Sequence, residues 1–216
     1  MPGKLHYYQM GGQSHSIRAL LHLANFQYED YRIPFAEFAN HKDNYPFGEV
    51  PCWEEDGIML NQSNAILRVL GIRLGYFTED PMIAYNIDSL IEYMGGMQQK
   101  MISYMLPNVK GGAALDPAAA DKWCADFWDQ ALPLLEARLA GHGKTYIGGT
   151  DRVTIADLKS CQCLLSTVWN PTTPIPSSVI DMLNQKFTQY PNFNRWAQNM
   201  RQVLDSYINS TTHGPL

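Results

Sequence analysis

The hydrophobic pattern of the chain changes once, close to Pro81, and this change limits the possible folds more than any other feature. Residues 4–75 alternate short strand-like runs with short helical ones. The sequence after Asp80 instead keeps the three- and four-residue spacing of amphipathic helices. We therefore predict an α/β N-terminal domain at residues 1–78, a linker at 79–84 and an all-α, helical C-terminal domain at 85–216.

The N-terminal region combines β-type and helical signals in a recognisable order. Strand-like runs are expected at residues 5–8, 28–33, 50–53 and 58–60, and helices after residues 14 and 62. Ser14 or Ser16 is a suitable N-cap for the first helix. Asp56-Gly57 between the last two runs is typical of a tight hairpin. The resulting order, β-α-β-(α)-β-β-α, describes the mixed sheet of a thioredoxin-like fold.

The C-terminal region carries helix signals and no strand pattern. A long helix is expected from Ile83 past Met101, and Asp116-Pro117 is suited to open the next one, because proline fits a first helical turn. Thr154 and Asp157 have the spacing of a capping box at the start of a later helix.

Charge and apolar content exclude two classes of partner. The chain of 216 residues has a formal net charge of -5 and no cluster of lysine or arginine, which argues against nucleic acid or an anionic membrane surface as a partner. No apolar run approaches the roughly 18 residues that a membrane-spanning helix needs. The four cysteines (Cys52, Cys124, Cys161, Cys163) form no Cys-x-x-Cys and suit free buried thiols in a reducing compartment. We expect a cytoplasmic protein.

Val50-Pro51 lies at the start of a predicted strand, directly after a loop. A cis bond there would turn the chain sharply and leave the backbone N–H and C=O of Val50 facing outward. Such an edge can pair with an extended peptide as an added strand. A trans proline entering an ordinary strand is the alternative. We predict the cis form because a loop precedes the dipeptide and the Asp56-Gly57 hairpin follows it.

Two further features are candidate parts of a site: a helix start that suits a substrate carboxylate, and a tyrosine at the end of a strand. Gln62 and Ser63 lie at the start of a predicted helix, where unpaired N–H groups and the helix dipole attract an anion. Ser63 as a plain helix cap is compatible with that function. Tyr7 lies near the end of the first strand, before a glycine-containing turn, although a strand tyrosine is most often a core residue.

Together these segments resemble the glutathione transferase family, particularly its sigma and mu classes. Lys4-Leu5-His6-Tyr7-Tyr8 is similar to the family's first strand, and Pro46-Phe47-Gly48-Glu49-Val50-Pro51 to the sigma-class run before the cis-proline. His15-Ser16-Ile17-Arg18 and Gln62-Ser63-Asn64-Ala65-Ile66-Leu67 resemble mu-class segments. The resemblance covers residues 4–75, and beyond them it rests on the helix pattern and the capping box.

The resemblance implies a glutathione site with assigned functions. Tyr7 would donate a hydrogen bond to the glutathione sulfur, the backbone of Val50 would pair with the cysteinyl part, and Lys42 would meet the glycine carboxylate. Gln62 and Ser63 would hold the γ-glutamyl end. The implied site is completed by Phe38, Gly48, Glu49 and Pro51, and the implied pocket for a second substrate by Met10, Gly11, Gly12 and Tyr104.

Three positions depart from the family pattern. Gln13 stands where the sigma class has an arginine, and Phe38 where it has a tryptophan. Gly96 stands where many members carry an acidic residue that reaches the partner subunit's glutathione. These departures predict weaker glutathione binding, or binding supported by other groups.

The resemblance implies a homodimeric glutathione transferase that activates glutathione, its co-substrate, for attack on a small hydrophobic electrophile in detoxification, with no metal and no further cofactor. Phe47 is a candidate to insert into the neighbouring subunit. Tyr8, expected on the opposite face of the strand, and Ser14 are the other hydroxyl donors near the turn. The alternatives are a glutathione-dependent isomerase or peroxidase, and a non-catalytic ligand-binding or structural homologue. A thioredoxin-like redox protein is disfavoured by the missing Cys-x-x-Cys.

Overall fold

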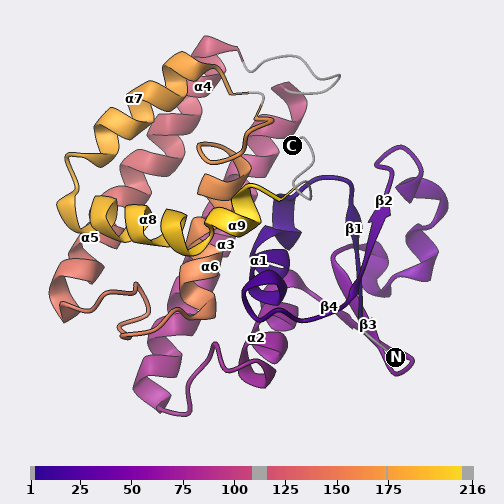
Figure 1. Ribbon diagram of the computed structural model, residues 1–216. Helices are drawn as coiled ribbons and strands as arrows, with labels where there is room; N and C mark the ends of the chain where they lie inside the picture. The colour runs from indigo at the N-terminus through magenta and orange to yellow at the C-terminus, as the bar shows by residue number, and fades with distance from the viewer. Residues whose placement is uncertain (1–2, 109–115, 174, 211–216) are drawn as a thin grey trace.

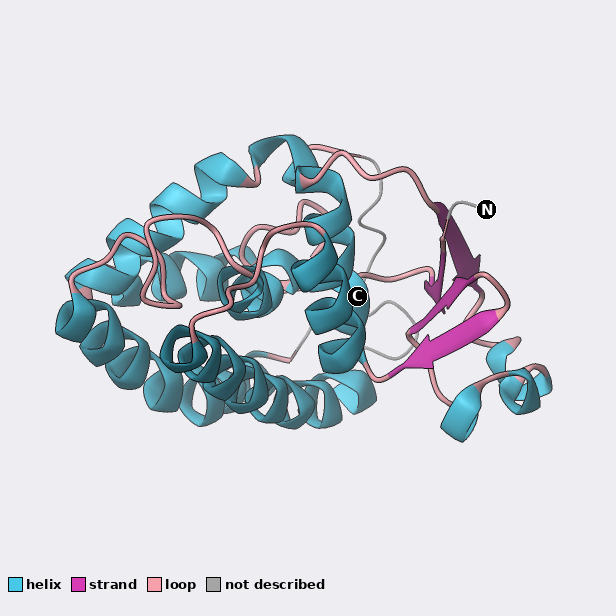
Figure 2. Ribbon diagram, turned by 90° about the horizontal axis from the view of Figure 1, so that it is seen from below, coloured by secondary structure: helices cyan, strands magenta, loops and turns pink. Residues whose placement is uncertain are grey.

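The computed structural model describes residues 3–108, 116–173 and 175–210, with the side chains of residues 104–108 and 117 left out. Four strands lie at one side of the molecule and most helices at the other (Figures 1 and 2). Helices α1 (His15–Leu23) and α2 (Ser63–Arg73) lie between the sheet and the remaining helices. The predicted division into an α/β part and an all-helical part is confirmed.

The sheet has the strand order β2-β1-β3-β4. Strand β1 (Lys4–Tyr8) pairs in parallel with β2 (Glu29–Ile33) and antiparallel with β3 (Cys52–Glu55), which pairs antiparallel with β4 (Ile58–Asn61). The predicted hairpin is confirmed: Asp56 and Gly57 connect β3 and β4 with φ of 51° and 77°, the positive values that a two-residue turn of this kind requires. Three short 3-10 turns, Phe38–Asn40, Lys42–Asn44 and Pro46–Gly48, carry the chain from β2 to β3.

Of the two alternative caps predicted for the first helix, Ser14 has the N-cap position and Ser16 does not, and neither side chain caps the helix. Ser14 is the N-cap residue of α1, but its side chain makes no capping bond, and its hydroxyl donates to the carbonyl of Gly11 at 2.8 Å. Ser16 lies inside α1 and donates to Gln162 Oε1 at 2.8 Å. Similarly, Ser63 is the first residue of α2 and Gln62 is its N-cap. The hydroxyls of Ser14 and Ser16 are thus oriented by the acceptors to which they donate, and neither caps the helix.

The helical part contains α3 (Pro81–Asn108), α4 (Pro117–Trp123), a π-helical turn (Cys124–Trp128), α5 (Asp129–His142), α6 (Ile155–Ser166), α7 (Ser177–Phe187), α8 (Pro191–Val203) and α9 (Asp205–Ile208). Helix α3 begins inside the segment expected to be a linker, because the carboxylate of Asp80 accepts from the N–H groups of Met82 and Ile83. Among the described residues, no helix is long and apolar enough to cross a membrane.

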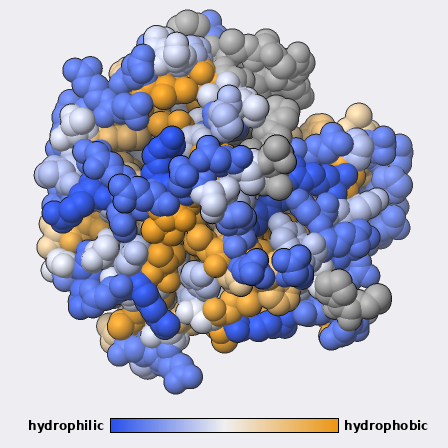
Figure 3. Space-filling model, viewed as in Figure 1, coloured by the Kyte–Doolittle hydropathy of each residue, from blue (hydrophilic) through white to orange (hydrophobic). Residues whose placement is uncertain are grey.

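Helix α6 lies at the centre of the helical part, and every one of its residues is buried. Its predicted capping box is confirmed: the N–H and hydroxyl of Thr154 both donate to Asp157 Oδ2 at 2.9 Å. Asp157 also accepts from Trp196 Nε1 at 2.9 Å, which ties α6 to α8. On the face shown in Figure 3, hydrophilic side chains cover most of the surface and hydrophobic ones gather in smaller patches, as expected when the apolar residues fill the core.

Candidate functional site

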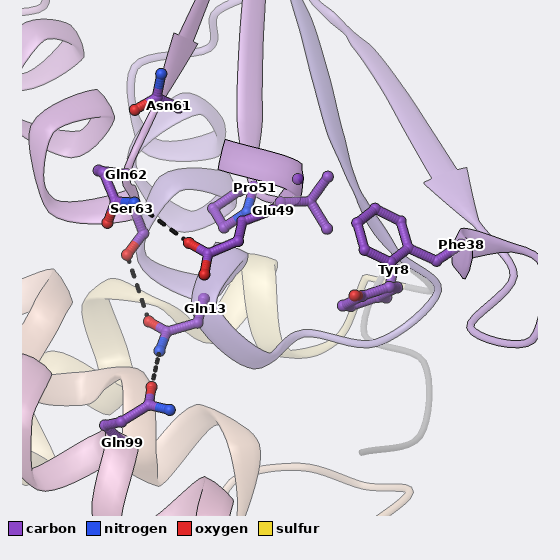
Figure 4. Close-up of a pocket in the computed structure, with 11 residues that line it drawn as sticks. Tyr8, Gln13, Phe38, Glu49, Pro51, Asn61, Gln62, Ser63 and Gln99 are labelled. Carbon is purple, nitrogen blue, oxygen red and sulfur yellow. Dashed lines mark hydrogen bonds between the residues drawn. The ribbon is translucent and has the colours of Figure 1, made fainter. Parts of the chain in front are cut away.

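A cavity of about 300 Å³ lies where the end of β1, the loop before β3 and the start of α2 meet α3. Most of its walls come from the N-terminal part, and one residue comes from the helical part (Figure 4). The lining residues are Tyr8, Gln13, Phe38, Gly48, Glu49, Val50, Pro51, Asn61, Gln62, Ser63 and Gln99. The structure thus brings together seven residues of the site predicted from the sequence: Phe38, Gly48, Glu49, Val50, Pro51, Gln62 and Ser63.

The Val50-Pro51 bond is cis, as predicted. Strand β3 begins only at Cys52, so Val50 stands outside the ladder of the sheet. Among the described residues, no hydrogen bond occupies the backbone N–H or C=O of Val50. This edge is available to an extended peptide that lies in the cavity.

The N-terminus of α2 forms the adjoining wall (Figure 4). Gln62 has a φ of 67°, a left-handed conformation that costs a residue with a side chain about 1–3 kcal/mol and is concentrated at functional sites. Its amide donates to Glu49 Oε2 at 3.3 Å, across the cavity wall (Figure 4). The first backbone bond of the helix runs from Ile66 N to Gln62 O, so the preceding N–H groups remain available for an anion.

A chain of polar side chains crosses the cavity from one part of the molecule to the other (Figure 4). Ser63 Oγ donates to Gln13 Oε1 at 3.4 Å, and Gln13 Nε2 donates to Gln99 Oε1 at 3.4 Å. Gln13, one of the departures from the family pattern, therefore connects α2 to α3 through its amide.

Tyr7 lies behind the cavity wall and not in it. Its side chain is 4% exposed, and its hydroxyl oxygen accepts from the backbone N–H of Gln13 at 2.9 Å. The hydroxyl is thus held by the backbone of a residue that lines the cavity, and among the described residues it donates no hydrogen bond of its own. Burial raises the pKa of Tyr7 to about 12, against the opposing effect of the Gln13 N–H, so the hydroxyl stays protonated at neutral pH.

Gly12 makes this arrangement possible. Its φ is 41°, and a Cβ atom at this position would lie 2.6 Å from the Tyr7 hydroxyl oxygen. A side chain at residue 12 would therefore displace the hydroxyl or the turn.

Tyr8 lines the cavity, which strand alternation did not predict. It is the last residue of β1, and its ring packs on Phe35 and Phe38 with ring centroids 5.0 and 5.2 Å apart. Phe38 thus contributes an aromatic wall together with Tyr8 (Figure 4). Burial raises the pKa of Tyr8 as well. The other rival donor, Ser14, is fully buried, and its hydroxyl is used by Gly11 O.

None of the remaining predicted residues is among those that line the cavity in the described part of the structure. The exposed side chain of Lys42 packs over Gly48, where a Cβ atom would lie 2.6 Å from Lys42 Cε. Met10, Gly11 and Gly12 do not line the cavity; the carbonyl of Met10 accepts from Arg18 Nη1 at 2.7 Å. Tyr104 falls in α3, and its side chain lies outside the described part of the structure.

Asn61 and Gln99 were missed by sequence reasoning. Asn61 ends β4, next to the predicted Gln62, so proximity in sequence was a usable signal. The sequence around Gln99 gave no such signal, because Gln99 reaches the cavity only through the packing of α3 against the N-terminal part. Gly96, three residues earlier, is exposed and has no described atom within 4 Å of the place where a Cβ would be.

The chain is similar to known proteins in its N-terminal part and over most of its length. Residues 3–71 match the family model "Glutathione S-transferase, N-terminal domain". The chain is 30% identical over 202 residues to glutathione S-transferase 1 of Ascaris suum, covering 89% of this chain and 94% of that one. It is 35% identical over 89 residues to human hematopoietic prostaglandin D synthase, covering 41% of this chain and 45% of that one.

The fold has a close counterpart among solved structures. Monomeric Na-GST-3, a glutathione S-transferase from the hookworm Necator americanus, superposes with a TM-score of 0.80 at 24% identity, covering 98% of each chain.

Proposed function

The chain belongs to the glutathione S-transferase family and is a glutathione transferase enzyme, and from that premise we propose that Tyr7 activates the glutathione thiol for attack on a small hydrophobic electrophile. The hydrogen bond from Gln13 N–H to the Tyr7 oxygen carries this proposal. Because the Tyr7 oxygen accepts in this bond, the phenolic proton remains available to donate to a sulfur atom at the cavity's edge.

The energetics are sufficient for this mechanism. A thiol with a pKa of about 8.5 is only roughly 3% ionised at pH 7, and lowering that pKa by about 2 units requires about 2.7 kcal/mol. A hydrogen bond to a charged sulfur contributes roughly 1.5–3 kcal/mol. A nearby helix N-terminus adds roughly 0.3–1 kcal/mol. One tyrosine hydroxyl and a helix dipole therefore suffice without a metal.

The proposed pose of glutathione follows the polar groups of the cavity. The backbone of Val50 pairs with the cysteinyl part, and the N-terminus of α2, with Gln62 and Ser63, holds the γ-glutamyl end. Lys42 is the cation at the rim for the glycine carboxylate. The electrophile would lie toward Met10, Gly11, Gly12 and Tyr104, next to the helical part. Support for this pose comes from the unused backbone of Val50 and the free N–H groups of α2.

A conjugation assay with a generic electrophile, combined with calorimetric titration of glutathione, tests the proposal. We expect glutathione-dependent conjugation that Tyr7→Phe strongly reduces. Binding without turnover would instead favour the non-catalytic homologue. Absence of glutathione binding would overturn the proposed site.

A second candidate activity is glutathione-dependent isomerisation, with the sigma-like class as the family branch. The similarity of 89 residues of this chain to human hematopoietic prostaglandin D synthase favours it. Product analysis with an endoperoxide substrate and with a peroxide separates isomerisation and peroxide reduction from conjugation.

We also propose a cytoplasmic homodimer. All four cysteines are free and buried, which suits a reducing compartment. Phe47 is 74% exposed on the loop before the cavity and is the proposed contact with the partner subunit. Na-GST-3 is monomeric, so sedimentation of this chain at micromolar concentration is the deciding measurement, and cell fractionation tests the compartment.

A further inference from the structure

The Gly12–Gln13 peptide group is held from both of its ends. Its N–H donates to the Tyr7 hydroxyl oxygen at 2.9 Å. Its carbonyl, that of Gly12, accepts from two side-chain amides of the helical part: Gln162 Nε2 at 2.8 Å and Gln98 Nε2 at 3.4 Å. A carbonyl oxygen has two lone pairs, and both are used here. The position of the group that supports Tyr7 is thus set by α3 and α6.

Each of these two amides is oriented by its own donor. Lys159 Nζ donates to Gln98 Oε1 at 3.3 Å, and Ser16 Oγ donates to Gln162 Oε1 at 2.8 Å. An ammonium group has three donors and no acceptor. Gln98 must therefore turn its oxygen to Lys159 and its NH₂ group to Gly12.

The burial of Lys159 requires an explanation. Lys159 and Gln98 are each 2% exposed, and Gln162 is 1% exposed. Within the described residues, no carboxylate forms an ion pair with Lys159. Lysine is almost never fully buried without such a partner. Burial lowers the pKa of Lys159 to about 8, with Glu92 opposing that shift, so the lysine is charged at neutral pH at a cost to stability.

We propose that Lys159 is a positioning residue for Tyr7: through Gln98 it fixes and polarises the Gly12–Gln13 peptide, whose N–H holds the tyrosine hydroxyl. The inference rests on the proposed function of Tyr7 as the group that activates the thiol. A donor on a peptide carbonyl strengthens the N–H of the same peptide as a donor, because hydrogen bonds in a chain polarise one another. A stronger N–H bond to the phenolic oxygen makes the hydroxyl a better donor to the thiolate. The helical part thereby acts on the thiol without touching it.

Lys159→Met removes the ammonium while keeping a side chain of similar length, so the amide of Gln98 is free to turn. Cooperative strengthening of about 10–30% per bond predicts that the pKa of the bound thiol rises by roughly half a unit and that kcat/KM falls about threefold. The dissociation constant of glutathione, measured by calorimetry at a pH well below the pKa of the bound thiol, should stay unchanged. The thiol pKa is read from the ultraviolet absorbance of the thiolate in the binary complex, at pH values below the titration of the lysine itself.

Two further variants sharpen the test. Gln98→Glu keeps an acceptor for Lys159 but presents an oxygen to Gly12 O, so it should raise the thiol pKa more than Lys159→Met does. Ser160→Ala is the matched control, because Ser160 is the neighbouring buried residue of α6 and its hydroxyl has no hydrogen-bond partner among the described residues. Its thiol pKa should equal that of the parent protein. A change as large as that in Lys159→Met would show that any polar deletion in α6 has this effect and would overturn the proposal.

Tyr7→Phe in the same titration separates this inference from the function on which it rests. If Tyr7→Phe leaves the thiol pKa unchanged, the proposed function of Tyr7 is wrong and the inference with it. If Tyr7→Phe raises the thiol pKa and Lys159→Met leaves it at the parent value, the positioning function of Lys159 alone is wrong, whatever the result for Gln98→Glu. If Lys159→Met does not fold, Gln98→Glu decides by the same criterion.

Discussion

Replacing Tyr7 with phenylalanine removes a hydroxyl that the structure uses as an acceptor and the mechanism needs as a donor. The lost bond to the thiolate is worth roughly 1.5–3 kcal/mol. Turnover in a conjugation assay should therefore fall by about 10–100-fold, and the pKa of bound glutathione should rise by roughly 1–2 units.

The same substitution has a second effect that the structure makes visible. It leaves the N–H of Gln13 without its 2.9 Å partner, and an unsatisfied buried donor costs about 1–3 kcal/mol. Gln13 is only partly buried and lines the cavity, so water reaches this N–H and the cost belongs at the lower end of that range. We expect the fold to remain intact, with unfolding in denaturant shifted by about 1 kcal/mol.

Tyr8→Phe is the matched control, since Tyr8 lies on the same strand and its ring lines the cavity. It should alter glutathione affinity modestly and leave the thiol pKa at the parent value. The reasoning is refuted if Tyr8→Phe raises the thiol pKa and Tyr7→Phe does not. Full activity in Tyr7→Phe with loss in Ser14→Ala would instead assign the donor to Ser14.

Four other perturbations have defined outcomes. Gly12→Ala should reduce turnover more than tenfold, because its Cβ would lie 2.6 Å from the Tyr7 oxygen at a φ of 41°; kinetics on folded variant protein checks this. Gln62→Gly should weaken glutathione binding in calorimetry and raise the free energy of unfolding by up to about 1 kcal/mol, because glycine relieves the left-handed φ. Phe47→Ser should convert the proposed dimer to a monomer in sedimentation, and an intact dimer would remove Phe47 from the interface. The pKa of Lys159 is lower in the folded than in the unfolded protein, so the unfolded state binds more protons between about pH 8 and 10.5. The contribution of Lys159 to the free energy of unfolding therefore rises with pH across that window. Denaturation should accordingly show Lys159→Met as the more stable protein at pH 7, with a difference that narrows above pH 8.

Local signals in the sequence predicted much of the fold and part of the site. Asp56-Gly57 gave the hairpin because positive φ is needed at both positions, and Thr154 with Asp157 gave the start of α6 because their spacing fits a reciprocal cap. The serine caps failed for a physical reason. The acceptor to which a hydroxyl donates orients the whole group, and the acceptor of Ser16 is Gln162, which is far away in the sequence.

The polar residues of α6 show where sequence reasoning reaches its limit. The pattern Leu158, Cys161, Leu165 predicts one apolar face, and a periodic pattern assumes that the other face meets water. Helix α6 is instead buried on all sides, so Lys159 and Gln162 lie inside the protein. A buried donor needs an acceptor. The Gln162 amide donates directly to the carbonyl of Gly12, and Lys159 is linked to the same carbonyl through Gln98. The polar side chains of α6 thereby support the turn at Gly12, which lies 150 positions before Gln162 in the sequence. No local pattern contains that pairing, because only the packing of α6 against the first turn of the chain creates it.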